Sequence, residues 1–259
     1  MEQKGVLVDL TLCTGCRGCQ VACKQWNERA AQKRPQFAGD FTNPVSLSAD
    51  CYTRIRFVEG EKGGQPAWSF VKDQCLHCKE PACASACPVG ALTKTPAGPV
   101  AYDFDRCIGC RYCLVACPFG IPKYEWDTTS PWVQKCTFCS ERIADGLAPA
   151  CIKTCPSGAL YFDDHGKVVA EAERRIKEGG KRYVPHVFGK EEAGGTNWIY
   201  ISDVPFDQLG FRTRTPKVSL PSLTWDVLSS IPLKAGGIIA LLGAVAYLRN
   251  RNADQEVSS

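Results

Sequence analysis

Sixteen of the seventeen cysteines in this 259-residue chain fall into four groups of four. Group I is Cys13, Cys16, Cys19 and Cys23; group II is Cys75, Cys78, Cys83 and Cys87; group III is Cys107, Cys110, Cys113 and Cys117; group IV is Cys136, Cys139, Cys151 and Cys155. Groups I and III have the spacing C-x2-C-x2-C-x3-C, in which three thiolates hold one iron–sulfur cluster and the fourth ligates its neighbour. Groups II and IV are variants of this spacing. Four [4Fe–4S] clusters require sixteen thiolates, so the pattern predicts four such clusters.

Two other uses of these cysteines can be weighed against iron–sulfur ligation. Disulfides require an oxidising compartment during folding, and four repeated ligand runs argue against them. Zinc favours two separated C-x2-C pairs and does not explain a longer run repeated along the chain. His77 lies inside group II and could ligate iron, but the set of thiolates is already complete. We expect the remaining Cys51 to be a small buried apolar side chain.

The order of the groups predicts how they share clusters, because a fourth cysteine serves a partner run. Groups II and III are adjacent in the sequence, which leaves group I to pair with group IV around them. The predicted ligands are therefore Cys13, Cys16, Cys19 and Cys155 for cluster a; Cys136, Cys139, Cys151 and Cys23 for cluster b; Cys75, Cys78, Cys83 and Cys117 for cluster c; and Cys107, Cys110, Cys113 and Cys87 for cluster d.

The segments that flank the cysteine groups predict the elements that position them. Apolar stretches at 6–9, 91–94, 100–103 and 158–162 read as strands, a charged helix is expected at 168–181, and a strand at 198–201. The insertion of group IV at 140–150 is expected to form a short helix and turn. Gly15, Gly18 and Gly109 are expected to supply positive φ in the ligand loops.

These elements predict an α+β fold made of two nested ferredoxin-like units, each binding two clusters. The expected boundaries are 1–50 with 130–165 for groups I and IV, 51–129 for groups II and III, 166–222 for an extension, and 223–250 for a single transmembrane helix. Ligation cross-links the loops, so we expect the chain to fold poorly without its clusters.

The net charge of the protein depends on the charge that its predicted clusters carry. The formal net charge is +4, but an oxidised cluster with four thiolates carries about −2, which brings the total to about −4. Basic residues beside the ligands are candidate counter-charges: Arg17, Lys24, Lys79, Arg106, Arg111, Lys135, Arg142 and Lys153. No basic block with interleaved aromatic residues occurs, so nucleic-acid binding is not predicted.

Residues 235–248 carry no charge, and the apolar stretch extends back to 231 across Pro232 and Lys234. A membrane span needs about 20 residues, so we predict one anchoring helix that contacts lipid. Arg249 and Arg251 favour a cytoplasmic C-terminus. No export signal is recognised, so a periplasmic cluster domain at the inner membrane would require export with a partner that carries a twin-arginine signal. A cytoplasmic cluster domain is the alternative.

Residues 13–28 (CTGCRGCQVACKQWNE), 107–123 and 135–160 resemble the four-cluster iron–sulfur subunits of molybdopterin oxidoreductase complexes. The resemblance implies a place between a molybdenum or tungsten catalytic subunit and a quinone-reactive cytochrome b subunit in the membrane. Some members replace a group III cysteine by tryptophan, whereas here all are present, which implies four [4Fe–4S] clusters. Residues 194–201 and the apolar C-terminal helix most resemble the subunits of respiratory formate dehydrogenases.

The function expected from this resemblance is electron transfer without catalysis by the chain itself. The alternatives are the equivalent subunit of a membrane hydrogenase, or of another molybdopterin oxidoreductase for sulfur compounds, nitrate or nitrite. A cluster-based redox sensor would need an effector module, and the segment 163–215 is too short and featureless to be one. A self-contained enzyme is disfavoured because full thiolate sets leave no open iron.

Overall fold

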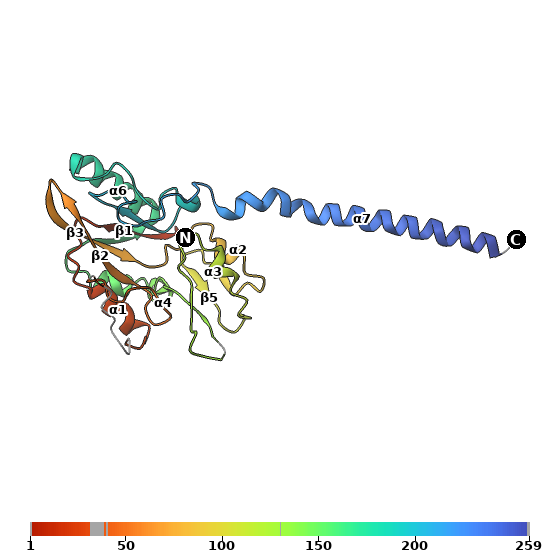
Figure 1. Cartoon of the computed structure of the whole chain (residues 1–259), viewed down its shortest axis with the longest axis horizontal. Coiled ribbons are helices and arrows are strands. Elements are labelled where there is room, and N and C mark those ends of the chain that lie inside the picture. The colour runs from red at the N-terminus through yellow and green to blue at the C-terminus, as the bar shows by residue number, and fades with distance from the viewer. Residues whose placement is uncertain (1, 32–38, 40, 130, 258–259) are drawn as a thin grey trace. The chain divides into compact units, whose positions relative to one another are not determined.

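The computed structural model describes residues 2–31, 39, 41–129 and 131–257 (Figure 1). The strands are β1 Lys4–Asp9, β2 Arg54–Lys62, β3 Gln65–Asp73, β4 Leu92–Lys94, β5 Val100–Tyr102, β6 Lys123–Tyr124, β7 Val133–Gln134, β8 Leu160–Asp164 and β9 Trp198–Ile201. The α-helices are α1 Gly18–Trp26, α2 Ala82–Ser85, α3 Tyr112–Ala116, α4 Ser140–Ala144, α5 Ala150–Lys153, α6 His165–Gly179 and α7 Leu220–Val257. Two units separate by their contacts, Met1–Leu220 and Pro221–Ser259. The predicted strands and the helix in the group IV insertion are confirmed.

A three-stranded sheet in the order β8-β1-β9 forms the centre of the first unit. β1 runs antiparallel to β8 and parallel to β9, and Val6 pairs with both Phe162 and Trp198. Alternating side chains of a strand face opposite sides of a sheet, and both sides are buried here. Val6 lies in the large core that contains cluster ligands, while Leu7 packs toward α6. The sheet therefore separates the cysteine loops from α6.

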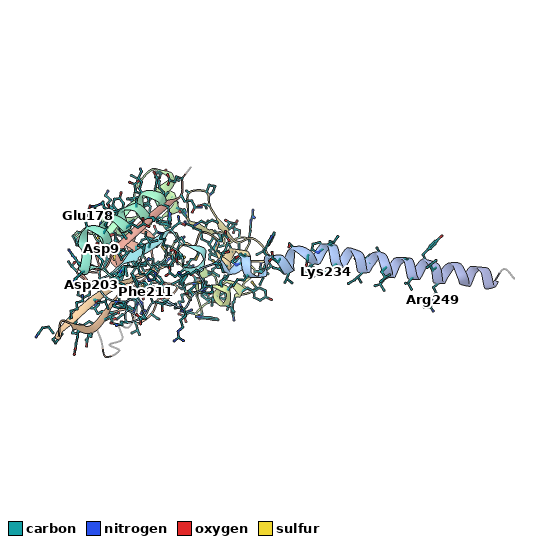
Figure 2. All side chains as sticks on the ribbon, turned by 90° about the horizontal axis from the view of Figure 1, so that it is seen from above. Asp9, Glu178, Asp203, Phe211, Lys234 and Arg249 are labelled. Atoms are coloured by element: carbon teal, nitrogen blue, oxygen red, sulfur yellow. The ribbon has the colours of Figure 1, made fainter. Side chains whose placement is uncertain are left out.

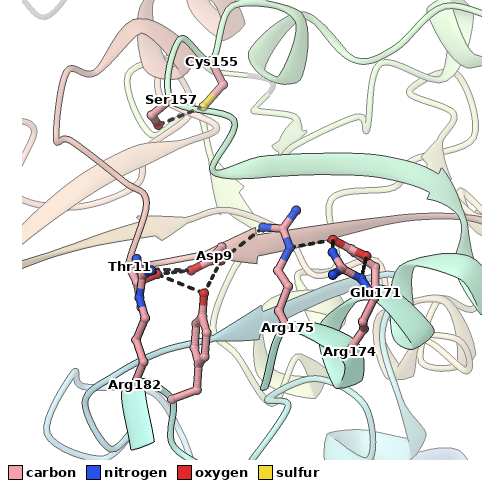
Figure 3. A network of polar contacts seen from close by, with 9 residues as sticks. Asp9, Thr11, Cys155, Ser157, Glu171, Arg174, Arg175 and Arg182 are labelled. Atoms are coloured by element: carbon pink, nitrogen blue, oxygen red, sulfur yellow. Dashed lines mark hydrogen bonds and ion pairs between the residues drawn. The ribbon is translucent and has the colours of Figure 1, made fainter. Parts of the chain in front are cut away.

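A buried carboxylate anchors the end of β1, directly before group I (Figure 3). Asp9 is fully buried and accepts hydrogen bonds from the Thr11 hydroxyl at 2.7 Å and the Tyr183 hydroxyl at 2.9 Å. Arg175 of α6 completes the site, with Nη1 3.1 Å from the carboxylate. A buried charge requires such partners. The contacts fix the start of the group I loop against α6.

The same arrangement of elements occurs twice in the first unit. β4 and β5 pair antiparallel, and the helices on either side of them, α2 and α3, contact each other. β8 and β1 also pair antiparallel, and α5 and α1, which flank them in the same way, contact each other. Here α5 and β8 lie after β1 and α1 in the sequence, so the second copy is built from two distant segments. The two longer strands β2 and β3 form a separate hairpin.

The second unit is dominated by the single helix α7. Thirty residues of it, Leu220–Arg249, are long and apolar enough to cross a membrane, and none of the tested window is buried. Figure 2 labels Lys234 and Arg249 on this helix. A helix of 30 residues is about 45 Å long, which exceeds the roughly 30 Å hydrocarbon core of a bilayer. The predicted apolar C-terminal helix is confirmed, and its insertion in a membrane stays a prediction.

Candidate iron–sulfur centres

Groups I and III adopt the same backbone path. Gly15 and Gly109, each placed before the second cysteine of its run, have φ of 68° and 69°. Arg17 and Arg111 follow the second cysteine with φ of 60° and 65°, and a helix begins at the next residue. The expectation for Gly18 is wrong, because this residue is the first of α1 and the preceding arginine adopts the left-handed conformation instead.

Groups II and IV form a second matched pair. His77 and Phe138, the residues before the second cysteine, both have positive φ, 49° and 58°. In each group the third cysteine is the second residue of a short helix that begins directly after a proline, Pro81 or Pro149. The longer group IV loop accommodates α4. The two rings also meet, because the centroids of His77 and Phe138 lie 4.9 Å apart.

The thiols of groups I and IV influence each other electrostatically. Burial raises the pKa of the Cys13 thiol, and Cys155 and Cys16 raise it further. Burial also raises the pKa of Cys23 to about 12, with Cys151 and Cys139 adding to the shift. The first and fourth cysteines of group I therefore lie near group IV, as the ligand sets of clusters a and b require.

Groups II and III approach each other in the same reciprocal way. The pKa of Cys78 is raised well above its usual value by burial and by the neighbouring thiols Cys75, Cys117 and Cys83. Burial raises the pKa of Cys113 to about 11, and Cys107, Cys110 and Cys87 raise it further. Cys117 thus lies with group II, while Cys87 lies with group III. The predicted exchange of fourth ligands requires this proximity, and the exchange itself stays a prediction.

Three further electrostatic interactions between thiols relate the four predicted sets to one another. Cys19 interacts with Cys151, Cys136 with Cys75, and Cys83 with Cys113. These pairs join the predicted ligands of cluster a to b, of b to c, and of c to d. Cys16 and Cys110 are exposed, and they belong to the first and last sets of the line. The predicted sets therefore follow one another through neighbouring thiols, with an exposed cysteine in the first set and in the last.

The shape of the ligand sets fits clusters better than single ions. Among the described residues, no three His, Cys, Asp or Glu side chains come close enough together to hold one metal ion. Instead, Cys23, Cys136, Cys139 and Cys151 line one small shared cavity of about 10 Å³. Four thiols that face one point are the number that an iron–sulfur cube requires, and these four are the predicted ligands of cluster b. The zinc alternative has no such support.

Most of these cysteines keep neutral, protonated thiols until iron binds. Burial raises the pKa of Cys19 to about 11 and that of Cys83 to about 12, so iron must displace their protons. Cys87 differs: although burial acts to raise its pKa, the pKa is lowered because backbone N–H groups, including those of Leu92 and Ala91, stabilise the thiolate. The N–H of Ala91 lies 3.2 Å from its sulfur.

A lysine that the sequence analysis missed lies between two ligand sets. Lys72 is 2% exposed, and its Nζ donates to Thr53 Oγ1 at 2.6 Å and to Gln74 Oε1 at 2.9 Å. Burial alone would lower its pKa, but the pKa is raised because the thiols Cys151, Cys19, Cys136 and Cys23 surround it. These cysteines belong to the sets for clusters a and b, so Lys72 is a buried counter-charge shared by both.

Two more lysines lie near the other ligands. Lys135 is buried, and its Nζ donates to the carbonyl oxygens of Val100 at 2.5 Å and Cys136 at 3.2 Å. Burial lowers the pKa of Lys94 to about 8, and its Nζ contacts the carbonyl of His77 at 3.1 Å. Among the eight basic residues proposed from the sequence, only Lys135 is buried; the others are half-buried or exposed.

We expect removal of iron to unfold the unit Met1–Leu220, because the buried loops are cross-linked chiefly through their ligands. Treatment with acid and a chelator should abolish visible absorbance and expose this unit to limited proteolysis. The helical far-UV signal of α7 in detergent serves as the internal control, since α7 carries none of the sixteen cysteines. A chelated protein that keeps its native protease resistance would contradict this coupling.

Comparisons with known proteins agree with this geometry. Two models of a 4Fe-4S dicluster domain match the chain, at residues 12–91 and 66–165. The chain is 41% identical over 255 residues to a protein of Nitratidesulfovibrio vulgaris, covering 96% of this chain and 68% of that protein. It is 36% identical over 259 residues to the formate dehydrogenase iron-sulfur subunit of Haemophilus influenzae, covering 97% and 82%.

A further relative belongs to another enzyme system. The chain is 34% identical over 238 residues to the hydrogenase-2 operon protein HybA of Escherichia coli O157:H7, covering 79% of this chain and 71% of that protein. Two dicluster domains and a full set of cysteines support four [4Fe–4S] clusters. The chain therefore belongs to the family of formate dehydrogenase iron–sulfur subunits, which are electron-transfer subunits of molybdopterin oxidoreductases.

Proposed function

We propose that this chain carries electrons from formate oxidation to the membrane. In this proposal it lies between a molybdenum or tungsten bis-pterin catalytic subunit and a cytochrome b subunit that reacts with quinone. The observation that carries the proposal is the unbroken line of neighbouring thiols through all four ligand sets. When bound, [4Fe–4S] clusters accept and donate single electrons, with potentials set by charge, hydrogen bonds and burial.

The chain's own residues position and tune these centres. We assign the ligands of clusters a to d as the reciprocal sets predicted from the sequence. The assignment is supported by the proximity of Cys155 to Cys13, of Cys139 to Cys23, and of Cys117 to Cys75. Buried lysines supply positive charge beside the thiolates, and the packed rings of His77 and Phe138 fill the junction between sets b and c.

The nested division of the chain follows from the repeated arrangement of elements. We propose that 1–50 with 130–165 forms one ferredoxin-like unit and that 51–129 forms the inserted one. The matching pairs β8 with β1 and β4 with β5, with α5 against α1 and α2 against α3, support two copies of one unit. Residues 166–222, which include most of α6 and the whole of β9, extend the first copy.

We further propose that 223–250 crosses the inner membrane and contacts lipid. Its support is the long apolar stretch Leu220–Arg249 of α7. Lys234 lies near one end of this stretch and can extend its charged group toward the interface. Arg249 at the other end favours a cytoplasmic C-terminus, which would leave the cluster domain in the periplasm after export with a partner.

An equivalent role in a membrane hydrogenase is the second candidate, and the similarity to HybA supports it. Both candidates use the same clusters, so they differ only in the partner that supplies electrons. The substrate of the intact complex separates them.

We expect formate, and not hydrogen, to reduce the clusters of the complex purified in detergent with the full-length chain. The reduced clusters can be followed by low-temperature EPR, with reduction of a soluble quinone analogue measured in parallel. Dithionite reduction of the same sample establishes the full cluster signal. Reduction by hydrogen alone would favour the second candidate, and a complex reduced only by dithionite would contradict both.

A further inference from the structure

Four buried polar atoms of the first unit have no hydrogen-bond partner among the described residues. They are Arg17 Nε, His77 Nε2, Tyr124 Oη and Trp198 Nε1. Buried polar groups in native proteins are nearly always paired, so each such atom requires an explanation. All four atoms can donate a hydrogen bond. None of their side chains belongs to the predicted ligand sets, yet each residue adjoins one of these sets in the sequence or in the fold.

Each of the four donors adjoins a different ligand set. Arg17 directly follows Cys16 of set a, and His77 directly precedes Cys78 of set c. Trp198 lines the cavity formed by the four cysteines of set b. Tyr124 packs in one core cluster with Cys113 and Cys107 of set d, and burial and the charges of these thiols raise its pKa. Four unpaired donors are thus distributed one to each predicted cluster.

The donor on His77 is defined by the partner of its other nitrogen. Nδ1 accepts the backbone N–H of Val100 at 2.9 Å, so the ring proton is carried by Nε2. The ring is fully buried and packs against the Phe138 ring in a tilted arrangement, with centroids 4.9 Å apart. His77 therefore presents a fixed N–H group inside the protein, at the junction of groups II and IV.

The side chains of Trp198 and Tyr124 are also buried. Trp198 is fully buried, with Lys72 Nζ 4.7 Å from its ring centre and the Phe138 ring 5.4 Å away. The indole nitrogen can only donate. Tyr124 is 3% exposed, and its hydroxyl has no hydrogen-bond partner among the described residues.

We propose that Arg17, His77, Tyr124 and Trp198 each donate a hydrogen bond to a sulfur atom of the cluster beside it, and that these bonds set the relative reduction potentials of clusters a, c, d and b. The proposal rests on the ligand assignment made under the proposed function. A hydrogen bond to sulfur stabilises the more negative, reduced cluster and raises its potential. Each of the four residues acts directly on one cluster.

The sharpest variant is Tyr124→Phe, because it removes one hydroxyl group and keeps the ring. In the intact complex we expect the iron content to remain at about sixteen per chain. The equilibrium constant for reduction of cluster d should fall by about tenfold, a shift of about 59 mV for one electron. Trp198→Phe should shift cluster b instead, and His77→Phe should shift cluster c. Mediated redox titrations followed by EPR measure each potential without formate.

A spectroscopic measurement separates a hydrogen bond from a general structural effect. After exchange into deuterated water, pulsed EPR of the reduced complex should detect a deuteron coupled to cluster d, and Tyr124→Phe should lose it. Tyr161→Phe is the matched control, because the Tyr161 hydroxyl already donates to Asp163 at 3.1 Å. Unchanged potentials and deuteron couplings in both Tyr124→Phe and Trp198→Phe, with full iron content, would overturn the proposal.

Failure of this proposal can be distinguished from failure of the proposed function. A complex that contains about sixteen irons and is reduced by formate, but whose variants behave like the parent, refutes only the hydrogen bonds. A parent complex that lacks the four clusters, or that formate does not reduce, refutes the proposed function whatever the variants show.

Discussion

Replacing Cys117 with alanine should damage cluster c and leave cluster d intact, although Cys117 belongs to group III. Its thiol lies beside Cys75 and Cys78 of group II, and both burial and Cys75 raise its pKa. A cube that has lost one of four thiolates becomes a three-iron cluster or is lost. This result would establish the exchange of fourth ligands on which the nested arrangement depends.

The measurement is the comparison of EPR signals between variants of the intact complex. Cys83→Ala, within group II, should remove the same signal as Cys117→Ala, while Cys113→Ala should remove a different one. Iron content should fall from about sixteen to between about twelve and fifteen per chain. A Cys117→Ala protein that instead matches Cys113→Ala would show that each group holds its own cluster.

Cys51→Ala supplies the matched control for these changes. Cys51 is fully buried, and its thiol donates to the carbonyl oxygen of Thr53 at 3.1 Å, so it already has a protein partner. It is the one cysteine outside the four groups. We expect this variant to keep all four cluster signals, with at most a modest loss of stability.

The flanking strands were predictable because they are local features. Short apolar stretches next to the cysteine runs pair as β1 with β8 and as β4 with β5. The reciprocal sharing of Cys87 and Cys117 is expected from the order and spacing of the groups, and it stays a prediction. The strand at Trp198–Ile201 was also recognised, from four consecutive apolar residues.

The surroundings of the ligands were not predictable, because they come from segments far apart in the sequence. Lys72 lies in β3, a strand the sequence analysis did not identify, and no spacing connects it to Cys19 or Cys151. Trp198 was recognised as part of a strand but not as a wall of the cluster b cavity. The residues next to Lys72 in the sequence do not indicate that its side chain is buried.

Basic residues next to the ligands in the sequence also fail to identify most of the charges that lie near the thiols. Proximity in sequence to a ligand favoured Arg106, Lys79 and Lys153, all of which are exposed. Charges that share a buried environment with the thiols arrive instead through β3 and β4, on Lys72 and Lys94. Adjacent positions in the chain indicate the buried Lys135, but the positive charges of Lys72 and Lys94 are placed by tertiary packing.

Replacing Lys72 with methionine should lower the potentials of clusters a and b together. Methionine has similar length and no charge, so the variant removes the positive charge shared by these ligand sets. A unit charge about 8 Å away at an effective dielectric constant of about 20 contributes roughly 2 kcal/mol, or about 90 mV for one electron. Because a reduced cluster carries one more negative charge, loss of the cation makes reduction less favourable.

The distribution of the effect over the four clusters tests this interpretation. Redox titration of the Lys72→Met complex should show clusters a and b shifted by similar amounts and cluster d nearly unchanged. Stability should also fall by about 1–3 kcal/mol, because Thr53 and Gln74 lose their buried partner. Lys167→Met, which removes an exposed lysine paired with Asp163, is the control for charge loss alone. Equal shifts in all four clusters, or none in a and b, would show that Lys72 does not act as their local counter-charge.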